Sequence, residues 1–140
     1  MMAEERLLTQ PVLHLLEMAG YETLCEAPFF QYAIDIYAKG TNPDDTVAVE
    51  LKLKNWNKAL RQARIYQLCA TYVFIAMPAE HVHRVNRSRL RGVGIGLITV
   101  EQRGNRTVAR RVLQADASGI ESKRHTARLL AQFGGNPNVT

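Results

Sequence analysis

A strict alternation of side chains in residues 47–54, VAVELKLK, constrains the fold more than any other feature of the sequence. All the odd positions are large and apolar, whereas the last three even positions are charged, namely Glu50, Lys52 and Lys54. This is the period of a β-strand, because successive side chains of a strand point to opposite faces. We therefore expect a strand with one buried face and one polar face, with Glu50 and Lys52 together on the polar face.

The segments around this strand predict an α/β domain. The expected elements, in chain order, are a helix at 3–19, strands at 21–26, 30–38 and 47–54, a helix at 56–70, a strand at 71–77, a helix at 79–91, strands at 95–100 and 107–113, and a helix at 119–133. Pro11 either bends the first helix or lies in its first turn, and Asn55 is a natural N-cap for the helix that follows it. Hairpins followed by a strand–helix–strand crossover predict a mixed β-sheet flanked by helices.

Length and composition predict one domain. The chain has 140 residues, so we expect residues 1–133 to form a single domain, and the Gly-, Asn- and Pro-rich residues 134–140 to form a mobile tail. No apolar run approaches the roughly 18 residues of a membrane span, and the N-terminus does not resemble a signal peptide. The two cysteines, Cys25 and Cys69, are expected to be reduced core residues of a cytoplasmic protein.

Charge is distributed unevenly along the chain. Residues 1–80 contain 7 basic and 10 acidic side chains, whereas residues 81–140 contain 11 basic and only 3 acidic ones. A basic half favours a polyanionic partner such as nucleic acid. The alternative is a solvated basic surface that binds nothing.

Two carboxylates are expected to face each other across a hairpin. The turn between the strands 30–38 and 47–54 is centred near Asn42 and Pro43, so opposed residues have numbers that sum to about 85, and Asp35 lies opposite Glu50. Like charges in that arrangement destabilise a sheet, which suggests that a cation lies between them. Mg²⁺ prefers oxygen ligands and often takes only one or two carboxylates. The alternative is an ordinary strand with its polar residues turned to solvent.

This arrangement resembles the PD-(D/E)xK nuclease superfamily. Asp35 on one strand, Glu50-Leu51-Lys52 on the next, and Gln62 followed by Tyr66 on the helix after them are similar to its motifs. Ile34 stands where the motif has proline. The stretch WNKALRQARIYQLCATYVFIAMP also looks like a group of small bacterial proteins of this superfamily that have no settled substrate. The resemblance implies a restriction-endonuclease-like α-β-β-β-α-β core.

The resemblance also implies roles for individual residues. Asp35 and Glu50 would bind Mg²⁺ or Mn²⁺, with the backbone carbonyl of Leu51 as a further ligand. Lys52 would act on the attacking water or the scissile phosphate, and Gln62 would position the water, the lysine or the phosphate backbone. Possible accessory residues are Glu5, from the first helix, and Tyr66.

The basic residues provide candidate phosphate contacts. On a continuous helix over 79–91, three arginines would form one stripe: Arg84, Arg87 and Arg91. Lys58 and Arg61 add charge on the helix that carries Gln62. His81 and His83 do not have the helical spacing of two metal ligands. We expect the arginines to contact phosphate oxygens.

Together these features predict a Mg²⁺-dependent deoxyribonuclease. We expect it to hydrolyse phosphodiester bonds in DNA endonucleolytically and to act as a homodimer, because a monomer of this size has little surface with which to hold a duplex. The first alternative is a non-catalytic nucleic-acid-binding module that retains the nuclease fold. The second is a structural or assembly protein in which the basic half has no partner.

Overall fold

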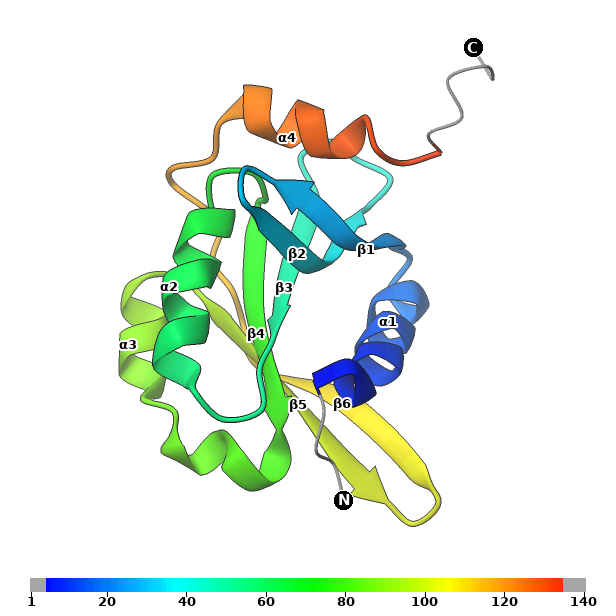
Figure 1. The fold of residues 1–140 in the computed structure, drawn as a ribbon, viewed down its shortest axis with the longest axis vertical. Helices are drawn as coiled ribbons and strands as arrows, with labels where there is room; N and C mark the ends of the chain where they lie inside the picture. The colour runs from blue at the N-terminus through cyan, green and yellow to red at the C-terminus, as the bar shows by residue number, and fades with distance from the viewer. Residues whose placement is uncertain (1–4, 135–140) are drawn as a thin grey trace.

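The computed structural model describes residues 5–134 and has an α/β fold, as predicted (Figure 1). Six strands form one sheet in the order β1-β2-β3-β4-β5-β6. The central neighbours β3, β4 and β5 are parallel, and the outer pairs are antiparallel. The elements are η1 (Glu5–Leu8), α1 (Thr9–Met18), β1 (Glu22–Phe29), β2 (Tyr32–Lys39), β3 (Thr46–Leu51), α2 (Trp56–Tyr66), β4 (Tyr72–Pro78), η2 (Ala79–Arg84), α3 (Arg87–Gly92), β5 (Gly96–Arg103), β6 (Arg106–Leu113) and α4 (Lys123–Leu130). The predicted tail, 134–140, lies outside the described residues except for its first glycine.

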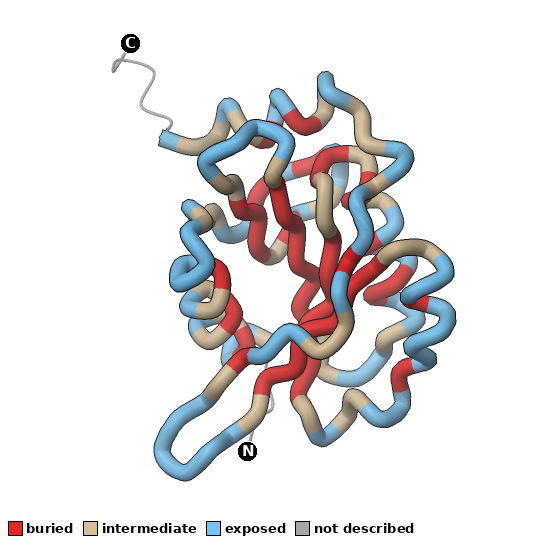
Figure 2. Tube along the Cα trace, turned by 180° about the vertical axis from the view of Figure 1, so that it is seen from behind, coloured by how far each residue is buried: buried red, intermediate tan, exposed pale blue. Residues whose placement is uncertain are grey.

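Apolar side chains on both faces of the sheet bury its central strands. Every residue of β3 and all but the first of β4 are buried, and the buried part of the trace runs through the middle of the molecule (Figure 2). One core cluster joins the sheet to α2 and α4 and includes Ala59, Tyr66 and Leu129. A second cluster joins the opposite face to α1 and includes Val12 and Phe74. None of the helices in the described part of the chain is long and apolar enough to cross a membrane.

The register of the β2–β3 hairpin confirms the sequence-based expectation. Ile36 pairs with Val49 and Lys39 pairs with Thr46, so opposed residue numbers sum to 85. The six-residue loop between them, residues 40–45, is closed by a hydrogen bond from the Gly40 amide to the Asp45 carbonyl, at 2.8 Å. Continuing the register by one residue brings Asp35 opposite Glu50.

Two of the expected helices differ from the prediction. The first is a 3₁₀ turn followed by α1, and Pro11 lies in the first turn of α1, where the missing amide hydrogen costs no intrahelical bond. The expected helix over 79–91 is broken into η2 and α3. Asn86 interrupts it, because its side chain accepts a hydrogen bond from the Arg89 amide at 3.2 Å and caps α3.

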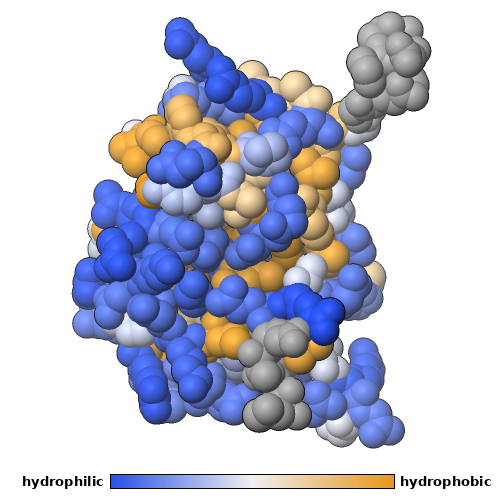
Figure 3. All heavy atoms as spheres, in the orientation of Figure 1, coloured by the Kyte–Doolittle hydropathy of each residue, from blue (hydrophilic) through white to orange (hydrophobic). Residues whose placement is uncertain are grey.

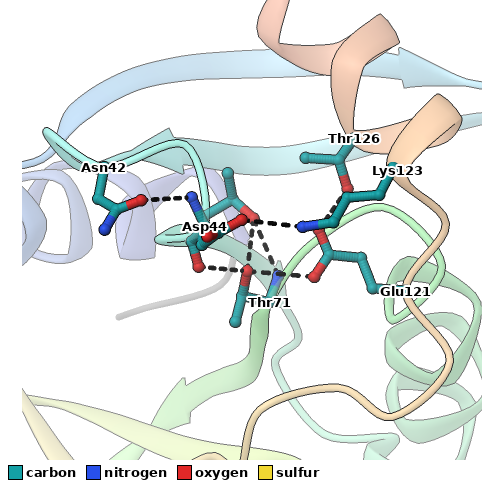
Figure 4. Close-up of polar contacts among 7 residues, drawn as sticks. Asn42, Asp44, Thr71, Glu121, Lys123 and Thr126 are labelled. Atoms are coloured by element: carbon teal, nitrogen blue, oxygen red, sulfur yellow. Dashed lines mark hydrogen bonds and ion pairs between the residues drawn. The ribbon is translucent and has the colours of Figure 1, made fainter.

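A polar network fastens α4 to the β2–β3 turn (Figure 4). The Thr71 hydroxyl donates to the Asp44 carbonyl at 2.8 Å and also contacts the Glu121 carboxylate at 3.2 Å. The Lys123 ammonium contacts the Asp44 carboxylate at 2.8 Å, and the Thr126 hydroxyl donates to Glu121. These contacts hold α4 on the face of the sheet that α2 also covers.

Candidate functional site

Asp35 and Glu50 come together in the interior, next to the end of β3. A carboxylate oxygen of Asp35 accepts a hydrogen bond from the Leu51 amide at 2.8 Å, which fixes Asp35 beside the residue after Glu50. Glu50 is only 5% exposed. The two carboxyl groups are close enough that the charge of Asp35 raises the pKa of Glu50. The chain thus places the buried Glu50 and the half-buried Asp35 together at the carboxyl end of a parallel strand, where open α/β sheets commonly bind ligands.

The environment of this pair favours protonation. Burial is the main reason that the pKa of Glu50 rises to about 8, and the charge of Asp35 raises it further, against the opposing effects of Tyr66 and Lys52. Burial also raises the pKa of Asp35, although the hydrogen bond from Leu51 opposes this. Glu50 therefore keeps its own proton near neutral pH. A buried carboxyl group that keeps its proton beside a second carboxyl group forms a site that a cation would convert to the ionised form.

Helix α2 contacts the same site through Tyr66. The Tyr66 hydroxyl donates to a carboxylate oxygen of Glu50 at 3.1 Å, and the Tyr66 side chain is fully buried. Gln62 lies one turn earlier on the same edge of α2. Its amide oxygen is buried and has no hydrogen-bond partner among the described residues. A buried acceptor without a donor is costly, and a ligand or water that donates to it would remove that cost.

Lys52 and Glu5 form an ion pair at the edge of the site. The strand ends at Leu51, so Lys52 lies in the following loop and not on the strand as predicted. Its ammonium is 3.6 Å from the Glu5 carboxylate, yet it remains near enough to lower the pKa of Glu50. The charge of Glu5 in turn raises the pKa of Asp35. The structure thus brings together Glu5, Asp35, Glu50 and Lys52.

Sequence reasoning missed Glu26, which lies on β1 across from Asp35. The flanking pairs Cys25–Ile36 and Ala27–Ile34 bracket it, and its charge raises the pKa of Asp35. Glu26 has φ 55°, a left-handed conformation that costs a residue with a Cβ about 1–2 kcal/mol. A single glutamate on an edge strand matches no sequence motif, so its position beside Asp35 could not be predicted. Cys25, on the same strand, is exposed, so the expectation of a core residue there is wrong, whereas Cys69 is buried.

The candidate phosphate contacts lie on three exposed segments. Lys58 and Arg61 are exposed on α2, and hydrophilic side chains cover the side of the molecule where α2, α3 and η2 lie (Figure 3). Arg84 belongs to η2, whereas Arg87 and Arg91 belong to α3, so the predicted single stripe of three arginines is wrong. All three are nevertheless exposed. Arg89, for which the sequence predicted no role, contacts the Trp56 ring at 5.4 Å and so links α3 to α2.

The ligand set for a metal is incomplete in the protein alone. Within residues 5–134, no three side chains of His, Cys, Asp or Glu meet as a group that could hold a metal ion. An ion held by Asp35 and Glu50 would need water, substrate or a backbone carbonyl such as that of Leu51, which is the usual coordination of Mg²⁺.

A separate cavity lies between α1 and the sheet, on the face away from α2. Its volume is about 610 Å³, and residues of α1 and β6 such as Leu16 and Ala109 line it together with Tyr21. The Tyr21 hydroxyl donates to Asp45 at 2.6 Å. None of the acidic residues of the Asp35–Glu50 site lines this cavity, so it plays no part in the arrangement above.

Fold and site define an α/β protein in which a buried and a half-buried carboxyl group meet at the end of a parallel strand. The fold is similar to that of a solved structure described as SPO1766 protein of unknown function from Silicibacter pomeroyi. The two share 16% sequence identity with a TM-score of 0.69 over 94% of this chain and 84% of the other. At that identity the likeness concerns the fold alone. No protein-family model and no curated protein matches the sequence.

Proposed function

We propose that the protein is a nuclease that requires Mg²⁺ or Mn²⁺ and hydrolyses phosphodiester bonds in DNA endonucleolytically. The observation that supports this most is the pair of neighbouring carboxyl groups, half-buried Asp35 and buried Glu50, with Lys52 close enough to lower the pKa of Glu50. The helix that holds Glu50 through Tyr66 also carries Gln62, whose buried amide oxygen has no partner among the described residues. The order α1-β1-β2-β3-α2-β4 is consistent with a restriction-endonuclease-like core. The resemblance of the motif residues to PD-(D/E)xK nucleases favours the same reaction.

The donor chemistry of the site fits a hard divalent cation. Asp35 and Glu50 supply carboxylate oxygens, and Glu50 would release its proton when the cation binds. A cation bound there would supply Lewis-acid stabilisation of charge on the phosphate. The Tyr66 hydroxyl holds one oxygen of Glu50 and so leaves the other oxygen for the ligand.

Lys52 and Gln62 would serve the attacking water. The Lys52 ammonium would leave Glu5 and donate to the phosphate oxygens as their charge develops, or orient the water. The buried Gln62 oxygen would accept a hydrogen bond from that water and hold it in line. The exposed Lys58, Arg61, Arg84, Arg87 and Arg91 would contact the DNA backbone.

The test is cleavage of closed circular, branched, linear duplex and single-stranded DNA with Mg²⁺ or Mn²⁺, and with EDTA. We expect metal-dependent cutting that includes a substrate without ends, because the reaction is endonucleolytic. Glu50→Gln and Lys52→Ala should abolish it. Lys54→Ala, an exposed lysine two residues along, is the matched control and should retain activity. DNA binding without any cleavage would instead support a non-catalytic nucleic-acid-binding module.

We further propose that the protein acts as a homodimer in the cytoplasm. Both cysteines are free thiols, which is usual for cytoplasmic proteins. A 15.8 kDa chain offers little surface to hold a duplex, and pairing two copies would double it. Sedimentation at the mass of two chains supports this, and sedimentation at one chain's mass contradicts it.

A further inference from the structure

An aromatic ring stands exposed at the tip of the β1–β2 hairpin. Phe29 and Tyr32 are the last pair of the ladder, so Phe30 and Gln31 form a two-residue loop. Phe30 is 61% exposed and has φ 54°. Glycine is the residue usually found at the first position of such a loop when φ is positive. The chain thus maintains a large apolar ring in solvent at a conformational cost of about 1–2 kcal/mol.

The ring of Phe30 is held in place. Its centroid lies 4.7 Å from that of Phe29 and 5.2 Å from that of His125, which packs edge-on against it from α4. The side-chain amide of Gln132, just after α4, donates to the Pro28 carbonyl at 3.3 Å and so links this end of α4 to the same hairpin. His125 Nδ1 is buried and unpartnered within the described chain. These contacts leave one side of a pre-positioned ring open to solvent.

The helix that supplies His125 also carries two exposed arginines. Arg124 and Arg128 are exposed on α4 on either side of His125 in sequence, and no ion pair or hydrogen bond joins them to another described residue. Lys123, by contrast, is engaged by Asp44. An exposed aromatic side chain with arginines beside it is the arrangement that binds unpaired bases and their phosphates.

The tip lies on the same hairpin and the same face as the carboxyl pair. Phe29, Tyr66 of α2 and Leu129 of α4 belong to one core cluster, and α4 lies above the hairpin in the view of Figure 1. The Tyr32 ring packs edge-on against Tyr66, which in turn bonds Glu50. Phe30 is five residues before Asp35, which is roughly 17 Å along a strand.

We propose that Phe30, with His125, Arg124 and Arg128, forms a stacking site for an unpaired base, so that the substrate is DNA with a single-stranded segment beside the cut. This rests on the proposed function in that the ligand is DNA. Phe30 would stack on the base, and the two arginines would contact the neighbouring phosphates. A continuous duplex, whose bases are stacked inside, would gain nothing from Phe30.

The experiment measures the affinity of the full chain, in EDTA, for a labelled 15-nucleotide oligo-dT and for a 15-base-pair duplex. Phe30→Asn removes the ring but tolerates the positive φ, so the fold is expected to persist. Oligo-dT affinity should fall roughly 5- to 100-fold, the usual effect of losing one stacked base, while duplex affinity changes less than about twofold. Met18→Asn, which removes another exposed apolar side chain, is the matched control and should change neither.

A second variant reports stacking directly. The chain has one tryptophan, so Phe30→Trp combined with Trp56→Phe leaves a single indole at the tip. Its fluorescence should be quenched by oligo-dT. Three outcomes would overturn this inference and leave the proposed nuclease intact. They are an unchanged oligo-dT affinity of Phe30→Asn, unquenched indole fluorescence, and a wild type that binds and cuts duplex DNA but does not bind single strands. Failure to bind or cut any DNA would overturn both.

Discussion

At the scale of single residues, the proton held by Glu50 links stability to pH. Its folded pKa of about 8 lies above the ordinary value of 4.5, so the folded state binds the proton more tightly than the unfolded state. This contribution is fully present below pH 4.5 and is lost as the pH rises toward 8. Glu50→Gln mimics the protonated side chain permanently. We therefore expect the metal-free variant to equal wild type near pH 5 and to exceed it by a few kcal/mol, on the order of 2–4, above pH 8.

Urea unfolding in EDTA across this pH range measures the difference. Glu22→Gln, at an exposed glutamate of β1, is the control and should follow wild type. If Glu50→Gln is less stable than wild type above pH 8, the folded protein stabilises the ionised form of Glu50 and its pKa is not raised.

Tyr66 should tune the affinity of the site for metal. Its hydroxyl lowers the pKa of Glu50, so Tyr66→Phe should raise that pKa and disfavour the ionised form that a cation needs. We expect metal binding at neutral pH to weaken roughly tenfold, as expected for a hydrogen bond to a charged group, with a stability loss of about 1 kcal/mol. The midpoint of the metal-dependent rise in melting temperature gives the affinity. An unchanged midpoint would mean that Tyr66 serves packing alone.

At the scale of elements, the arginines of η2 and α3 are expected to govern the salt dependence of DNA binding. Changing Arg84, Arg87 and Arg91 together to glutamine should reduce the slope of log K against log salt by up to about 0.9 for each phosphate that is no longer neutralised. The control removes the same charge from the β5–β6 hairpin through Arg103, Arg106 and Arg110, which are also exposed. Equal effects of the two variants would indicate general attraction by net charge and no defined binding surface.

The elements also explain what the sequence could predict. The β2–β3 register could be predicted because typical turn residues separate two alternating strands, and this register places Asp35 opposite Glu50. The β1–β2 loop could not be predicted, because Phe30 and Gln31 are not typical turn residues. The break between η2 and α3 had a signal in Asn86, which is a good N-cap, but the helical spacing of the arginines on both sides hid it. The proximity of α4 to the hairpin tip depends on tertiary packing, which no local pattern encodes.

At the scale of the whole molecule, the site depends on groups that three separate segments bring together. Glu5 lies in η1, before α1. Asp35 and Glu50 come from the β2–β3 hairpin, and Gln62 and Tyr66 come from α2. A cation that binds only the folded chain must therefore stabilise the whole fold by mass action. A tenfold excess over Kd gives about 1.4 kcal/mol, or roughly 4 °C in a domain of this size.

The most direct test of the central claim is the melting temperature at neutral pH in EDTA and then in increasing millimolar Mn²⁺ or Mg²⁺, for wild type, Glu50→Gln and Lys52→Ala. The proposed site requires a rise in wild type, no rise in Glu50→Gln, and a retained rise in Lys52→Ala, because lysine is not a ligand. If the melting temperature of wild type does not change with either metal, the proposed metal site is contradicted. Asp35 and Glu50 would then be a pair of carboxyl groups that binds no metal.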